Sequence, residues 1–146
     1  MKETVLVTGG AGYIGSHTAV ELIQAGFDVV IADNLSNSDL QAVEGVRRIT
    51  GAEVPFEQID CCDLQAMRRL FERHEFRSVI HFAASKAVGE SVAEPLKYYR
   101  NNLLSFLNVV ELMRDFGRPN ILFSSSCTVY GLSLIHISEP TRPLYI

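Results

Sequence analysis

The stretch TVLVTGGAGYIG, residues 4–15, decides the fold that this sequence predicts. A short β-branched run stops at Gly9, and glycine then recurs at Gly12 and Gly15, with Gly10 as an alternative first member. This spacing predicts a tight turn between a buried strand and a helix, where bare backbone and free N–H groups can meet a pyrophosphate. A turn that only packs a helix against a strand is the alternative. The place directly after the first strand favours phosphate binding.

Outside this stretch, hydrophobic periodicity alternates between strand and helix lengths. Further strands are predicted at residues 29–32, 54–59, 78–82 and 121–123, and helices at residues 14–23, 38–49, 63–71 and 95–116. Ser38 and Asp63 are expected to cap helices, Pro95 suits a first helical turn, and Pro55 places its strand at a sheet edge. Five strands alternating with four helices predict an α/β protein with a doubly wound parallel sheet, the Rossmann fold.

Composition limits the possible functions. The chain has 146 residues, 47% of them hydrophobic, which is enough for one domain with a core. Its 13 basic and 17 acidic residues create no positive field, so we expect no nucleic-acid partner. No apolar run is long enough for a membrane span, and the start does not resemble a secretory signal. Three cysteines, two of them adjacent at Cys61 and Cys62, suit reduced thiols in the cytoplasm. We assign no metal site.

A carboxylate and a polar loop follow the second predicted strand. Asp33 stands 18 residues after Gly15, where a carboxylate accepts hydrogen bonds from the adenosine ribose. Residues 34–38 (NLSNS) carry no cation for an extra phosphate, so the pattern favours NAD over NADP. The alternative is that Asp33 only ends the strand. Asp60 closes the third strand and is expected near the adenine, with Cys61 as a small neutral wall rather than a reactive thiol.

Residues 8–17 resemble the extended short-chain dehydrogenase/reductases. Three further stretches are similar to the UDP-glucose 4-epimerase family within them: HFAASKAVGES at 81–91, YYRNN at 98–102 and SSSCTVYG at 124–131. The resemblance covers residues 2–131. It implies a redox-neutral reaction in which a hydride leaves C4 of a UDP-hexose and returns to the opposite face, with NAD bound throughout. It also implies a homodimer for the intact family, which we do not expect this chain to form.

The glycine motif and the resemblance together predict the cofactor contacts. They are Gly9, Gly12, Tyr13, Ile14, Gly15, Asp33, Asn34, Leu35, Ser36, Asn37, Ser38, Asp60, Cys61, Phe82, Ala83, Ala84, Ser85, Lys86 and Asn101. The resemblance also gives Ser126 a catalytic role, as the serine that hydrogen-bonds the reacting sugar oxygen.

Several of these residues have simpler interpretations. Lys86 can be a solvated surface lysine, although its loop favours contact with the nicotinamide ribose. A position on a helix surface easily explains a single asparagine, but it explains the adjacent pair Asn101 and Asn102 less well. His81 and His17 are interpreted as hydrogen-bonded core histidines rather than catalysts. Four more polar residues are interpreted as structural: Glu90, Tyr98, Ser124 and Ser125.

The chain departs from the family in two respects. The family's general base is a tyrosine followed four positions later by lysine. None of the five tyrosines here has a lysine four positions later, and Lys97 is the last lysine. The likeness stops at Gly131, and residues 132–146 resemble a translated sequencing adapter. We therefore expect residues 1–131 to be the N-terminal part of a cofactor domain, truncated after its fifth strand and inactive, with 132–146 a non-native tail.

Two other functions remain open from the sequence. A nucleotide-sugar 4,6-dehydratase needs an added acid and base. Dehydratases of this family resemble one another in an Asp-Glu pair after the fifth strand, where Cys127 and Thr128 stand here. A non-catalytic NAD-binding module would explain the missing Tyr-x-x-x-Lys, but it would not need the substrate-side residues 86–91 and Ser126.

Overall fold

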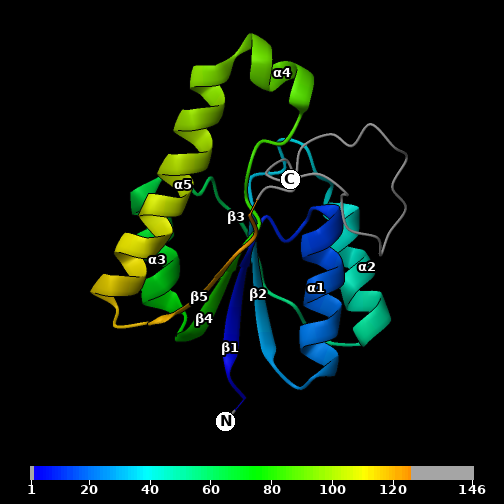
Figure 1. Ribbon diagram of the computed structural model, residues 1–146. Helices are drawn as coiled ribbons and strands as arrows, with labels where there is room; N and C mark the ends of the chain where they lie inside the picture. Colours follow the sequence, from blue (N-terminus) through cyan, green and yellow to red (C-terminus); the bar gives the residue numbers. More distant parts are fainter. Residues whose placement is uncertain (1, 126–146) are drawn as a thin grey trace, which may run out of the picture.

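The computed structural model describes residues 2–125, in which a parallel sheet lies between two layers of helices (Figure 1). The strands are β1 (Thr4–Thr8), β2 (Asp28–Asp33), β3 (Phe56–Gln58), β4 (Phe76–His81) and β5 (Asn120–Phe123), in the order β3-β2-β1-β4-β5. Leu6 at the centre pairs with Val30 of β2 and Val79 of β4. Because the strand order reverses at β1, a crevice opens at the carboxyl ends of β1 and β4. The predicted doubly wound parallel sheet is confirmed.

The helices cover the sheet in pairs (Figure 1). They are α1 (Tyr13–Gln24) and α2 (Leu40–Thr50) on one face, α3 (Leu64–Arg73) and α5 (Pro95–Asp115) on the other, and the short α4 (Val88–Ala93) beyond the strand ends. Alternation along β1 sends Val5 and Val7 into the core beneath α1 and α2, and Leu6 into the core beneath α3 and α5. The helix α4 was not predicted, because six residues are too short for a periodic pattern.

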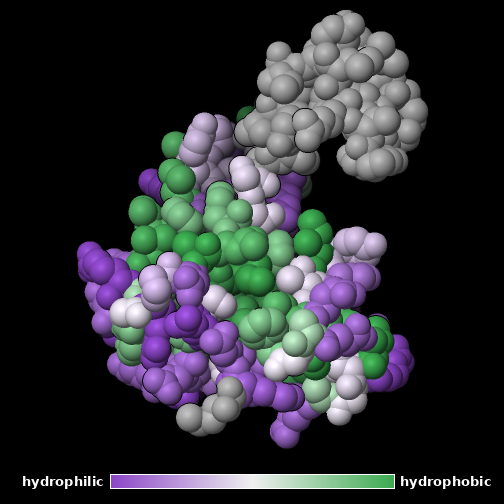
Figure 2. All heavy atoms as spheres, turned by 60° about the horizontal axis from the view of Figure 1, so that its bottom comes forward, coloured by the Kyte–Doolittle hydropathy of each residue, from purple (hydrophilic) through white to green (hydrophobic). Residues whose placement is uncertain are grey.

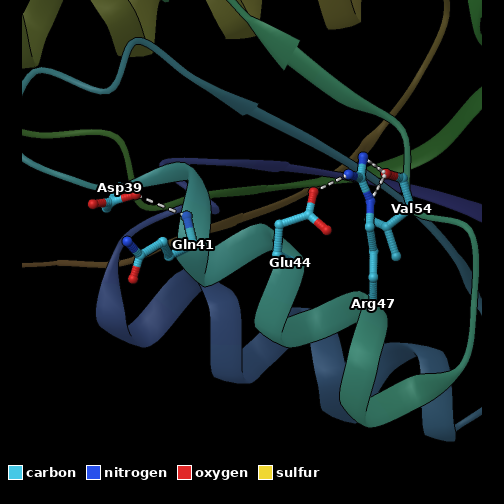
Figure 3. Close-up of polar contacts among 5 residues, drawn as sticks. All are labelled: Asp39, Gln41, Glu44, Arg47 and Val54. Carbon is cyan, nitrogen blue, oxygen red and sulfur yellow. Dashed lines mark hydrogen bonds and ion pairs between the residues drawn. The ribbon is translucent and has the colours of Figure 1, made fainter.

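The predicted helix starts agree with the observed ones except at α2, where the capping residue differs. Asp63 caps α3 as predicted, its carboxylate accepting from the backbone N–H groups of Gln65 and Ala66 at 3.0 Å each. The predicted cap of α2 was wrong by one residue, since Asp39 accepts from Gln41 N at 2.8 Å (Figure 3). Ser38 instead donates its hydroxyl to Asp33. Asp39 caps the helix because the Ser38 hydroxyl is engaged by Asp33, and the extended backbone of Asp39 places its carboxylate at the helix start.

The edge strand β3 is tied to α2 by an arginine (Figure 3). The Arg47 guanidinium donates two hydrogen bonds to the Val54 carbonyl, at 2.7 and 3.1 Å, and also contacts Glu44. The edge position expected from Pro55 is confirmed, but the strand is shorter than residues 54–59. Arg47 occupies the Val54 carbonyl, and Ile31 N donates to the Pro55 carbonyl at 3.0 Å just before the strand begins.

Hydrophobic residues also gather on the surface, as the green area in the middle of Figure 2 shows. The most exposed large hydrophobic side chains of α5 and β5 are Leu96, Tyr99, Leu103, Leu107, Leu122 and Phe123. The outer side of this layer is therefore less polar than that of an ordinary surface helix. None of the helices in residues 2–125 has the length and hydrophobicity of a membrane span.

Candidate functional site

The turn between β1 and α1 is packed too tightly for side chains. Gly9 has a φ of 69°, and a Cβ there would lie 2.7 Å from the backbone N of Ala83. A Cβ on Gly15 would lie 2.3 Å from the Gly9 carbonyl oxygen. Gly9 N donates to the Ala32 carbonyl at 2.8 Å, which joins the turn to β2. Glycine is therefore required at two points so that strand, turn and helix can touch.

The helix that leaves this turn begins without a side-chain cap. Gly12 is the N-cap residue of α1 and offers no side chain, and the first turn holds no acidic residue. The first N–H groups of a helix lack intrahelical acceptors, and the dipole adds positive potential there. By contrast, aspartates fill this position in α2 and α3. The start of α1 thus retains N–H donors for an anion. The short α4 also begins without a side-chain cap, but its first turn carries the acidic Glu90.

Asp33 lies beside this turn at the end of β2 and is only 7% exposed. Its Oδ2 accepts from the backbone N–H of Ala11 at 3.1 Å, while Oδ1 accepts from Leu35 N at 2.9 Å and from the Ser38 hydroxyl at 2.8 Å. Three donors from two segments therefore fix the carboxylate. They also satisfy a charge that would be costly to bury alone.

The loop after β3 is held from the other helical layer. The buried Asn108 of α5 donates to the carbonyls of Cys61 and Cys62, at 3.0 Å each. Burial, helped by the charge of Asp60, raises the pKa of the Cys61 thiol to about 12 and that of Cys62 to about 11. Both thiols are therefore neutral at physiological pH. This supports a neutral wall rather than a reactive cysteine at Cys61.

The loop after β4 is held by two asparagines of α5. The Asn102 carboxamide accepts from Ser85 N at 2.8 Å and donates to the Ser85 carbonyl at 3.1 Å. Asn101 donates to the Ser85 hydroxyl at 3.2 Å. The asparagine pair is therefore not merely helix surface, since both side chains reach the same loop residue.

The two histidines differ from each other. His81 is a buried core histidine as predicted, its Nδ1 paired with the Thr8 hydroxyl at 2.7 Å, and burial lowers its pKa to about 4. The interpretation of His17 as a core residue was wrong, because it is exposed on α1 and contacts the Tyr13 carbonyl and ring. Its position on the helix directs it away from the sheet.

Glu90 and Tyr98 join α4 to α5, which agrees with their interpretation as structural residues. The Tyr98 hydroxyl donates to Glu90 at 2.7 Å, and the Lys97 ammonium contacts the same carboxylate. The hydrogen bond from Lys97, followed by that from Tyr98, lowers the pKa of Glu90.

These loops surround a cavity of about 350 Å³ at the carboxyl ends of the strands, a size within the range of ligand pockets. It is lined by Gly9, Gly12, Tyr13, Ile14, Gly15, Asp33, Asn34, Ser36, Asn37, Ile59, Asp60, Cys61, Phe82, Ala83, Ala84, Ser85, Lys86, Asn101 and Ser105. Of the predicted contacts, Leu35 and Ser38 do not line it. Leu35 packs against the core beneath α1 and α2, and Ser38 is engaged by Asp33. Ser126, Cys127 and the tail lie outside the described residues.

Sequence reasoning missed Ile59 and Ser105. Ile59 directly follows β3, and the sequence pattern counted it as a strand residue rather than a lining residue. Ser105 stands one helical turn after Asn101, so its i, i+4 spacing was a usable signal. Nothing in its residue type marks it within a hydrophobic helix.

A glycine turn, an uncapped helix start and a carboxylate at the switch point of this sheet define a Rossmann-fold domain. A family model described as GDP-mannose 4,6 dehydratase matches residues 6–145, and the chain belongs to this family. The chain is also similar to the UDP-glucose 4-epimerase of Neisseria gonorrhoeae, with 54% identity over 141 residues that make up 96% of this chain and 42% of the relative.

Solved structures agree with these similarities. UDP-glucose 4-epimerase from Bifidobacterium longum, in complex with NAD+ and UDP, matches with a TM-score of 0.86 and 48% identity, over 96% of this chain and 42% of that one. UDP-glucose 4-epimerase from Stenotrophomonas maltophila, with bound NAD and formylated UDP-arabinopyranose, matches with a TM-score of 0.85 and 46% sequence identity. The match covers 97% of this chain and 42% of that one. The expected resemblance to these epimerases is confirmed. The chain spans less than half the length of the relatives it matches.

Proposed function

We propose that this chain is the NAD-binding portion of a UDP-glucose 4-epimerase. The observation that carries the proposal is the buried Asp33 carboxylate, fixed at a cavity beside an uncapped helix start. A carboxylate has about four lone-pair positions, and three donors reach this one, so acceptor capacity remains for a ribose hydroxyl. The names of the relatives narrow the class to enzymes of UDP-hexoses.

The residues that line the cavity fit a dinucleotide. The free N–H groups of the first turn of α1 would hold its diphosphate, and the closed packing at Gly15 keeps side chains out of that position. Asp33 and residues 34–38 would hold the adenosine ribose, with no cation there to favour NADP. Asp60 and Cys61 would flank the adenine, while residues 82–86 and Asn101 would reach the nicotinamide half. When bound, NAD supplies a reversible acceptor for hydride from C4 of the sugar.

The chain's own residues would then bind and orient, without completing catalysis. Ser126 would hydrogen-bond the reacting sugar oxygen. The tyrosine–lysine pair that removes the C4 hydroxyl proton in the family is absent from the sequence. We therefore expect the 146-residue chain to bind NAD without interconverting UDP-galactose and UDP-glucose. We also expect a cytoplasmic location and no dimer of this chain alone.

Two alternatives follow from specific observations. The matching family model is described as a dehydratase, but Cys127 and Thr128 stand where the dehydratases would carry their Asp-Glu pair. A non-catalytic NAD-binding module agrees with the missing tyrosine–lysine pair. Against it stands Ser126, which would contact the sugar in the epimerase assignment and would not be needed in a cofactor sensor.

Calorimetric titration of the purified, folded chain tests the proposal. We expect heat on addition of NAD+, much weaker binding of NADP+, and no product from UDP-galactose in a coupled assay. Absence of binding to NAD+ would overturn the assignment. Formation of UDP-glucose would instead overturn the expected inactivity. A response to UDP-glucose after saturation with NAD+ would argue against the sensor.

The proposed non-native origin of residues 132–146 has its own test. The family match extends across most of this segment, through residue 145. Re-sequencing the locus should show a gene that continues past Gly131 into a tyrosine–lysine pair. An unchanged sequence with a stop after Ile146 would contradict the proposal.

A further inference from the structure

The loop between β4 and α4 lines the cavity but has little regular structure of its own. Its last strand-like hydrogen bond runs from Phe82 N to the Thr8 carbonyl at 3.0 Å, and α4 begins only at Val88. Residues 82–86 nevertheless line the cavity. A segment of this kind needs an external anchor to hold its side chains in one place.

Asn102 supplies that anchor. Its carboxamide engages both backbone groups of Ser85, accepting at 2.8 Å and donating at 3.1 Å, as a neighbouring strand would. Only an amide side chain carries a donor and an acceptor side by side for this pairing. Asn102 does not line the cavity, and Lys86, the next residue after Ser85, does. The contact therefore fixes the backbone from which Lys86 extends.

Asn101 strengthens the same arrangement. Its Nδ2 donates to the Ser85 hydroxyl at 3.2 Å and to the Asn102 carboxamide oxygen at 3.0 Å. The Asn102 oxygen thus accepts two hydrogen bonds, which fixes the orientation of its amide. Ser85 is held at its N–H, its carbonyl and its hydroxyl by two adjacent residues of α5.

We propose that Asn102 is a positioning residue, which sets the affinity of the site for the nicotinamide half of the dinucleotide by holding Ser85 and therefore Lys86. The inference rests on the proposed function, since it assigns Lys86 to that half. This positioning role differs from a general contribution of Asn102 to the stability of the fold. A misplaced Lys86 weakens only ligands that extend beyond the diphosphate.

The test compares two ligands on folded protein. Asn102→Asp keeps the size and the acceptor for Ser85 N but turns an oxygen toward the Ser85 carbonyl. We expect the Kd for NAD+ to rise about tenfold, the loss expected for one broken hydrogen bond with an unsatisfied partner, and the Kd for ADP to change less than twofold. Asn120→Asp makes the same charge change at the start of β5 and should alter neither value.

A double variant identifies the route. In a Lys86→Met background, Asn102→Asp should add less than twofold to the Kd for NAD+, because the positioned group is gone. Equal weakening of NAD+ and ADP by Asn102→Asp, or a full tenfold loss in the Lys86→Met background, would overturn the inference.

Amide hydrogen exchange on the unmodified chain covers the case in which Asn102→Asp does not fold. The Ser85 amide should be protected well above a free loop amide, and rapid exchange would overturn the inference. If the unmodified chain binds neither NAD+ nor ADP, the proposed function fails. The exchange of Ser85 then still decides whether Asn102 holds the loop.

Discussion

The two sides of the cavity are built in different ways. The turn wall consists of backbone in close contact and one buried carboxylate, Asp33. Its lining residues are Gly9, Gly12, Tyr13, Ile14, Gly15, Asp33, Asn34, Ser36 and Asn37. The helix wall, residues 82–86 with Asn101 and Ser105, consists of an irregular loop held by side-chain amides of α5. The turn wall is held by packed backbone and by hydrogen bonds to Asp33, whereas the helix wall depends on where α5 lies along the sheet. Substitutions in the turn wall should therefore cause large losses of stability or NAD+ binding, whereas substitutions in the helix wall should change the affinity for NAD+ only moderately.

Gly15→Ala should have the largest effect on the turn wall. The new Cβ would meet the Gly9 carbonyl oxygen at 2.3 Å and the Gly10 Cα at 2.7 Å, and neither backbone group can move without opening the turn. We expect a loss of about 3 kcal/mol in the free energy of unfolding, measured by urea denaturation, together with loss of NAD+ binding.

Gly45→Ala is the matched control. Gly45 lies inside α2, and a Cβ there meets nothing within 4 Å, so alanine should stabilise the chain by up to about 1 kcal/mol. Equal effects of the two substitutions would show that the turn is not tightly packed.

Asp33→Asn should have the next largest effect. The substitution keeps the shape but removes the charge and places an NH₂ group against one of the three donors that reach Asp33. We expect about thirtyfold weaker binding of NAD+ by calorimetry, from the loss of a charge-assisted acceptor worth about 2 kcal/mol.

Asp39→Asn provides the comparison for Asp33. It removes the same charge six residues further on, and asparagine caps a helix as well as aspartate does. Its affinity for NAD+ should stay within twofold of the unmodified chain. A similar loss in both variants would mean that general charge, rather than the turn wall, attracts the ligand.

His81 connects the strands that lead to the two walls, through its pairing with Thr8 between β4 and β1. Burial lowers its pKa from 6.5 to about 4, so the unfolded chain binds a proton in this range that the folded chain does not. Stability is therefore retained above pH 6.5 and should fall by up to about 1.4 kcal/mol per pH unit as the pH drops toward 4.

The variant His81→Asn removes the titrating group and keeps an amide for Thr8. The difference in free energy of unfolding between the unmodified chain and this variant should be constant above pH 6.5 and change below it. Parallel pH profiles in urea denaturation would contradict the buried neutral histidine.

The contrast between the walls also explains what the sequence could predict. The glycine turn and Asp33 are local features, because each follows a strand whose pattern is clear, and the cavity brings them together. The cap of α2 was displaced from Ser38 to Asp39 because Ser38 contacts Asp33, a tertiary choice between two good capping residues. The hydrogen bonds between Asn102 and Ser85 depend on the position of α5 along the sheet. That position is set by tertiary packing, so no local sequence pattern predicts it.

Ser105→Ala should have the smallest effect and sharpens the description of the helix wall. The Ser105 hydroxyl donates to the Asn102 carbonyl at 3.3 Å within α5, and the side chain is buried at the cavity. Alanine loses this bond but has the higher helix propensity, so the free energy of unfolding should change by less than about 0.5 kcal/mol. Affinity for NAD+ should stay within twofold. Ser105→Leu, which adds volume at the same place, should weaken it clearly. A tenfold loss with alanine would make Ser105 a ligand of the cofactor, and the helix wall would then bind through its own helix rather than through the loops that it holds.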